Sequence, residues 1–114
     1  MPGWPARGQR KYANEPVSVD GIRFDSRAEY RRYVALRILA DAGAITALTV
    51  HPRWDLHALG GARVSRYTAD FSYRRDGALV VEDVKSPVTR KEASYRTRCR
   101  WMKAEYGITI TEVV

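Results

Sequence analysis

The sequence predicts a mixed α/β (α+β) domain, in which a mixed β-sheet is flanked by two main helices. Short runs of aromatic and aliphatic residues, of the types that favour strands, recur along the chain and are separated by turn residues. Two longer segments carry apolar residues at helical spacing instead. The second of these connects two predicted strands, an order that predicts a βαβ unit with parallel strands.

Length and charge set the next limits. With 114 residues, 45% of them hydrophobic, the chain suffices for one core and not for two. We expect residues 1–11, which include Arg7, Arg10 and Lys11, to form a flexible basic arm, and residues 12–114 to form a single domain. The net charge of +7 favours a polyanion as partner, because the neutralisation of phosphates releases counterions.

Cys99 is the only cysteine, which excludes an internal disulfide and a multi-cysteine zinc site. No apolar run approaches the roughly 20 residues that a transmembrane helix needs, and the N-terminus lacks the core of a signal peptide. We therefore expect a cytoplasmic protein with no membrane partner and no small-molecule cofactor.

The first part of the domain predicts a hairpin followed by a helix. Val17–Val19 and Ile22–Phe24 are strand-like runs on either side of an Asp-Gly turn. The helix should span Arg27–Asp41 and end near Gly43.

Glu29 has two interpretations. It stands three residues after Ser26, the spacing of a capping box, which alone would explain a glutamate there. It also shares a helical stripe with Tyr33, Leu36 and Ala40, which would turn its carboxylate toward the sheet. Spacing alone favours neither, and one residue can serve both purposes.

Two further strands are predicted at Ile45–Val50 and Trp54–Ala58, on either side of a corner at His51-Pro52. His51 and His57 are the only histidines. No cysteine or second histidine lies at a metal-binding spacing from either, so we expect ordinary structural or surface histidines.

The segment 66–85 predicts the central hairpin, with a two-residue Asp-Gly turn at 76–77. This turn would place Asp70 opposite Asp83, on the same face as Lys85. Directly opposed like charges are destabilising. A hard divalent cation is the usual reason for such a pair, since oxygen ligands suit Mg²⁺.

The register depends on the length of the turn. Two residues would also place Lys85 opposite Thr68, whereas a three-residue loop would bring Glu82 opposite Asp70. A four-residue loop would pair Asp70 with Val81. The acidic cluster is common to all three registers, and Glu82 is the reserve metal ligand.

Asp83 and Lys85 have a simpler alternative, an ion pair on an exposed sheet. Exposed pairs stabilise little, and the valine-rich sequence around them predicts burial. We therefore favour a metal site.

A second helix is predicted over Thr89–Tyr106, ending at Gly107, before a last strand at Ile108–Val114. Its basic residues have few acidic counterparts, which favours a phosphate-facing surface over an ordinary solvated face. The predicted nucleic-acid contacts, on this helix and the N-terminal arm, are Arg7, Arg10, Lys11, Arg90, Lys91, Arg96, Arg98, Arg100 and Lys103.

Asp70 followed by Asp83-x-Lys85, with Glu29 on an upstream helix, resembles the signature of the PD-(D/E)XK nuclease superfamily. More closely, an ordered set of motifs over residues 11–114 is similar to a family of small phage-encoded, junction-resolvase-like endonucleases in that superfamily. These motifs are Lys11-Tyr12, Asp20-Gly21-Ile22, Phe24-Asp25-Ser26, Glu29, Ala69-Asp70-Phe71, Val81-Glu82-Asp83-Val84-Lys85 and Tyr106-Gly107-Ile108.

The chain departs from the pattern at two positions. Ala69 stands where the name of the signature has proline, and His51 precedes Pro52 where we expect glutamine.

The resemblance implies a restriction-endonuclease-like core and a Mg²⁺-dependent endonuclease of phage origin acting on DNA in a bacterial host, with Mn²⁺ able to substitute. It implies that Asp70 and Asp83 hold the metal, with Glu82 in reserve, and that Lys85 positions water or offsets transition-state charge. Glu29 would orient the lysine or a metal-bound water, or help to bind a second metal ion.

The chain has no insertion for a sequence-reading domain, so we expect cleavage of branched or junction DNA, or nicking. Symmetric cleavage of both strands would need a homodimer. Two alternatives are a non-catalytic nucleic-acid-binding module and an accessory subunit of a phage replication or packaging complex.

Overall fold

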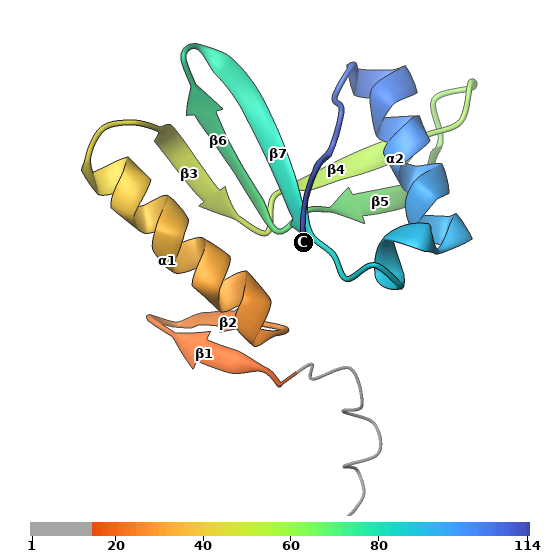
Figure 1. The fold of residues 1–114 in the computed structure, drawn as a ribbon. Helices are drawn as coiled ribbons and strands as arrows, with labels where there is room; N and C mark the ends of the chain where they lie inside the picture. The colour runs from red at the N-terminus through yellow and green to blue at the C-terminus, as the bar shows by residue number, and fades with distance from the viewer. Residues whose placement is uncertain (1–14) are drawn as a thin grey trace, which may run out of the picture.

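The computed structural model describes residues 15–114; the predicted arm at 1–11, with Arg7, Arg10 and Lys11, lies outside the described residues. The described chain confirms the mixed α+β class, with two helices and a mixed sheet (Figure 1). Its elements are β1 (Val17–Val19), β2 (Ile22–Phe24), α1 (Arg27–Asp41), β3 (Thr46–Val50), β4 (Arg53–His57), β5 (Arg63–Thr68), β6 (Phe71–Arg75), β7 (Ala78–Val84), the 3-10 helix η2 (Thr89–Lys91), α2 (Ala93–Tyr106) and β8 (Thr111–Val113).

The main sheet has the strand order β3-β6-β7-β8. The first three strands are antiparallel, and β8 runs parallel to β7. The parallel pair confirms the βαβ unit predicted from the sequence, with α2 as the crossover helix. Two other pairs, β1-β2 and β4-β5, form small antiparallel ribbons of their own.

The predicted register of the central hairpin is confirmed. Asp76 and Gly77 have φ angles of 52° and 80°, as a two-residue turn of this kind requires. Arg75 pairs with Ala78, and the pairing continues to the end of β6 in the same register. The next position outward therefore places Asp70 opposite Asp83.

The first strand of that hairpin differs from the expectation, because it is two strands. The strand is interrupted at residues 69–70. As a result, β5 pairs with β4, and only β6 pairs with β7. Thr68 consequently pairs with Arg53 and not with Lys85.

The β4-β5 ribbon continues the β3-β6 pair of the main sheet beyond a bend, so that these four strands together form one long, bent antiparallel ribbon. The register is the same on both sides of the bend, so His51 stands opposite Asp70. Two backbone hydrogen bonds carry the ladder through it: the N–H of His51 donates to the Asp70 carbonyl at 2.9 Å, and that of Ala69 donates to the Pro52 carbonyl at 3.0 Å.

The two helices cover different parts of the fold. In Figure 1, α1 lies beside β3, and α2 lies beside β4 and β5. The core under α1 consists of Phe24, Tyr33, Leu36, Ile45, Phe71 and Tyr73. The core under α2 consists of Leu56, Tyr67, Ala69, Val81, Tyr95 and Met102. Because residues alternate along β7, it contributes to both cores.

The second helix is shorter than predicted. Residues 89–91 form η2, Glu92 is extended, and α2 begins only at Ala93. Its end is as predicted, with Gly107 in the left-handed conformation at a φ of 70°. None of the helices in residues 15–114 is long and apolar enough to cross a bilayer.

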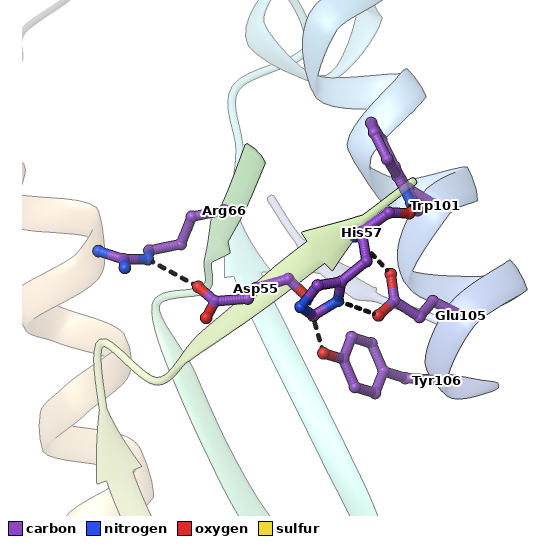
Figure 2. Close-up of polar contacts among 6 residues, drawn as sticks. All are labelled: Asp55, His57, Arg66, Trp101, Glu105 and Tyr106. Carbon is purple, nitrogen blue, oxygen red and sulfur yellow. Dashed lines mark hydrogen bonds and ion pairs between the residues drawn. The ribbon is translucent and has the colours of Figure 1, made fainter. Parts of the chain in front are cut away.

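Polar contacts fasten the end of α2 to β4 (Figure 2). Nδ1 of His57 lies 2.5 Å from the carboxylate of Glu105. The Tyr106 hydroxyl donates to the Asp55 carbonyl at 2.6 Å, and the Trp101 indole donates to the His57 carbonyl at 3.2 Å. His57 is therefore a structural histidine, as the sequence predicts.

The turn at 76–77 yields a stability prediction. A Gly77→Ala variant should lower the free energy of unfolding by about 1–2 kcal/mol, because alanine disfavours a positive φ. No atom lies within 4 Å of the added Cβ, so the effect is conformational and not steric. Thermal or urea unfolding followed by circular dichroism measures it.

Gly60→Ala is the matched control. Gly60 also has open space around its Cβ position but no positive φ. Alanine there should leave stability unchanged or raise it by up to about 1 kcal/mol. Equal losses in both variants would contradict the assigned turn.

Candidate active site

Two of the predicted acidic residues meet where β6 begins and β7 ends. The backbone N–H of Asp70 donates to Oδ1 of Asp83 at 3.1 Å, and Oδ2 of Asp70 accepts from the Val84 N–H at 2.7 Å. The Tyr67 hydroxyl donates to the other oxygen of Asp83. This reciprocal arrangement follows from the predicted hairpin register, which sets the two aspartates opposite each other.

Glu29 serves both purposes that its position in the sequence allows. Its N–H donates to Oγ of the N-cap residue Ser26 at 3.2 Å. Its side chain nevertheless points inward and is only 8% exposed. The Asp25 N–H donates to its Oε1 at 3.4 Å. The helix start thus delivers a buried carboxylate to the neighbourhood of Asp70.

His51 joins this group, which sequence reasoning missed. One side-chain atom each from Glu29, His51 and Asp70 lies within 4.8 Å of the others. Two ligands on opposite sides of a Mg²⁺ ion would be about 4.2 Å apart. The three side chains therefore have nearly the spacing of metal ligands, and their donor set suits a divalent cation.

Asp83 borders this group without belonging to it. It is 1% exposed, and donors from Tyr67 and the Asp70 backbone occupy its two oxygens. In this arrangement it fixes the backbone of Asp70 and adds a second buried negative charge beside it.

Burial leaves these carboxylates short of compensating charge. Desolvation, and then the charge of Glu29, raise the pKa of Asp70 to about 6. Desolvation also raises the pKa of Asp83 to about 6, although the hydrogen bond from Tyr67 acts in the opposite direction. The pKa of Glu29 is raised by desolvation and by the charge of Asp25. Each shift opposes ionisation, and a bound cation would reverse it.

The charge of Lys85 acts on all three of these carboxylates. Its charge lowers the pKa of Glu29, Asp70 and Asp83, although desolvation dominates each shift. Its Nζ lies 4.9 Å from the ring centroid of Tyr95, within cation–π range. The lysine therefore stands between the acidic group and α2.

Glu82 points away from Asp83, as the alternation of side chains along β7 requires. Arg32 of α1 binds it with two hydrogen bonds of 2.8 and 2.7 Å, and the Tyr73 hydroxyl donates to it as well. Desolvation acts to raise its pKa, but the hydrogen bonds from Arg32 and Tyr73 lower it below the usual value. The reserve ligand is thus committed to a buried ion pair.

A cleft of about 680 Å³ opens beside the acidic group. Glu29 and Lys85 line it, so the predicted site reaches solvent. Arg27 and Arg31 of α1 also line it, two basic residues that we did not single out in the sequence.

A second groove, of about 430 Å³, runs along α2. Of the basic residues predicted to contact nucleic acid, this groove gathers Arg90, Lys91, Arg96 and Arg100. Lys103 and Arg98 do not line it. Arg98 shares a helical stripe with Trp101 and Glu105, on the flank that faces β4.

Comparisons with known proteins give a family but no characterised relative. A family model described as "Protein of unknown function (DUF1064)" matches residues 9–109. No curated protein and no solved structure matches the chain.

The raised pKa values predict how stability depends on pH without metal. The folded protein holds protons on Asp70 and Asp83 more tightly than the unfolded chain does. Their contribution to stability is therefore present below about pH 4 and is lost as the pH rises through about 6.

We expect Asp70→Asn to be more stable than the wild type at pH 7 in EDTA, by about 1–3 kcal/mol. The amide oxygen can still accept from the Val84 N–H, while the buried charge is removed. At pH 4 the two proteins should be equally stable. Thermal unfolding at both pH values tests this, with Asp41→Asn, at an exposed carboxylate, as the control; a variant less stable at pH 7 would refute it.

Proposed function

The chain belongs to the DUF1064 family, and we propose that it is a metal-dependent endonuclease that hydrolyses phosphodiester bonds in DNA. The observation that carries the proposal is that the carboxylates of Glu29, Asp70 and Asp83 lie together beside a cleft, which Glu29 and Lys85 line. These residues come from the start of α1, the bend of the ribbon and the end of β7. The resemblance of these residues to the PD-(D/E)XK signature supports the same function.

An exposed structural ion pair does not account for the arrangement. Asp83 is 1% exposed and Glu29 is 8% exposed, and both have pKa values that burial raises. Uncompensated buried carboxylates destabilise a fold, so they usually mark a functional site.

Glu29 and Asp70 would hold a divalent cation, Mg²⁺ or Mn²⁺, with Asp83 as the neighbouring carboxylate. Such an ion, when bound, supplies a nucleophile at neutral pH and a counter-charge for the scissile phosphate. Lys85 would position the attacking water or offset the charge that develops on the phosphate. The ring of Tyr95 lies beneath Nζ of Lys85, and this contact would restrict the position of the ammonium group.

The cleft and the groove along α2 would share the binding of DNA. Lys85 lines the cleft, and Tyr95 lines the groove along α2, so the contact between these two side chains connects them. The basic groove would hold the phosphate backbone while Arg27 and Arg31 flank the reacting phosphate. We propose a substrate recognised by its structure, such as branched or junction DNA or a site of nicking.

We expect Lys85→Met and Asp83→Asn each to reduce Mg²⁺-dependent cleavage by at least about 100-fold. Both substitutions keep the size of the side chain, so the circular dichroism spectrum and unfolding midpoint should show an intact fold. The assay is a panel of linear, single-stranded, flap and four-way-junction DNA with Mg²⁺, Mn²⁺ or EDTA.

Arg75→Met, at the turn end of the β6–β7 hairpin, is the control that should cleave normally. Full cleavage by both site variants, in preparations free of host nucleases, would refute the active site. DNA binding that persists in EDTA without cleavage of any substrate would favour a non-catalytic binding module. Weak binding with little salt dependence would favour an accessory subunit.

The groove along α2 makes its own prediction. An Arg96→Ala/Arg100→Ala double variant should bind duplex DNA more weakly at every sequence. The slope of log K against log salt should become shallower by about 2, since each phosphate contact contributes about 0.9. Arg98→Ala, on the opposite flank of the same helix, should leave the slope unchanged. Fluorescence anisotropy at several salt concentrations distinguishes the two, and equal changes would argue against the groove.

A further inference from the structure

We propose that His51 is a nitrogen ligand of the cation at this site, and that the site therefore prefers Mn²⁺, or a similar first-row transition ion, to Mg²⁺. The inference rests on the metal site of the proposed function and goes beyond it, because it assigns a ligand and an ion that the carboxylates alone do not specify.

The bend of the ribbon places His51 at the site. Its backbone N–H donates to the Asp70 carbonyl, and the unbroken register makes the two residues direct cross-strand neighbours. His51 has a φ of 57°, and its ring centroid lies 6.2 Å from that of Phe24 in the core under α1. The same core holds α1, which carries Glu29. A ring nitrogen of His51 therefore lies within 4.8 Å of an oxygen of each of the two carboxylates.

Both partners have ligand atoms to spare. Within residues 15–114, neither ring nitrogen of His51 takes part in a hydrogen bond. The Glu29 side chain, more than nine-tenths buried, accepts only the 3.4 Å contact to Oε1 from Asp25, and its second oxygen accepts none from the described residues. The structure therefore leaves an imidazole nitrogen and a carboxylate oxygen within 4.8 Å of each other, both free to bind an ion beside the cleft that Glu29 lines.

The chemistry of the donors selects the ion. Mg²⁺ binds oxygen ligands and releases its water reluctantly, whereas imidazole suits first-row transition ions. Two carboxylates alone would bind Mg²⁺ or Mn²⁺. The added nitrogen gives the transition ion an advantage that Mg²⁺ cannot share.

Pulsed electron paramagnetic resonance of Mn²⁺ tests the ligand directly, because a coordinated imidazole nitrogen modulates the electron spin echo. The full chain without a histidine tag carries only His51 and His57, so the signal can be assigned by substitution. We expect nitrogen modulation in the wild type, its loss in His51→Gln, and its retention in His57→Gln. His57 lies at the contact between β4 and α2 and serves as the matched control.

Isothermal titration supplies the second measurement. His51→Gln should weaken Mn²⁺ binding by about tenfold or more and Mg²⁺ binding by less than about threefold. Asp70→Asn should weaken the binding of both ions. Mn²⁺ binding that depends on Asp70 but shows no nitrogen coupling from His51 would overturn the inference and leave the proposed function standing. Failure of the wild type to bind either ion would overturn both.

Discussion

The acidic site depends on how the charges of two adjacent carboxylates of β7, Glu82 and Asp83, are neutralised. Both are 1% exposed, and they point to opposite faces of the sheet. Glu82 receives a bidentate arginine and a tyrosine hydroxyl, which lower its pKa despite burial. Asp83 receives a hydroxyl and a backbone amide but forms no ion pair with any residue from 15 to 114, and burial raises its pKa to about 6. A buried charge without its partner costs the fold several kcal/mol in order of magnitude. The first face is complete without a ligand, whereas on the second face the charge of Lys85 does not offset the desolvation of the carboxylates.

The ion pair between Glu82 and Arg32 also determines where α1 lies relative to the acidic group. Arg32 lies one turn after Glu29 on α1, so its bond to β7 fixes the position of the helix against the sheet. The start of α1 then lies at the end of β7, beside Asp70. The bend of the long ribbon brings His51 and Asp70 to the same place from the other direction. The start of α1, the end of β7 and the bend of the ribbon thus meet in one small volume. None of them alone would form a site.

The hairpin register could be read from the sequence because Asp76-Gly77 specifies a turn of two residues, and the position of Asp70 against Asp83 then follows. The place of His51 could not be read in this way. Between Leu56 and His57 the register of β4 and β5 shifts by one residue, and this bulge decides which residue His51 faces. Without the shift, His51 would stand opposite Ala69. The composition of the segment does not predict the bulge. The sequence therefore could not distinguish His51, which lies beside Asp70, from the structural His57.

Basic residues gather at the groove along α2, and carboxylates gather at the cleft. This separation of charge relates the proposed DNA binding to the proposed metal binding. The chain carries a formal charge of +7, and a groove on α2 gathers four of its basic residues. A nucleic-acid backbone held there would extend past Tyr95 to Lys85 and then meet Glu29 and Asp70. Without a cation those carboxylates would repel a phosphate. Under the proposed function, the groove along α2 would then bind the polyanion while the carboxylates kept it out of the cleft. With a cation the same carboxylates become ligands and the repulsion turns into attraction. Under the proposed function, the metal therefore admits the substrate to the cleft as well as activating the reaction.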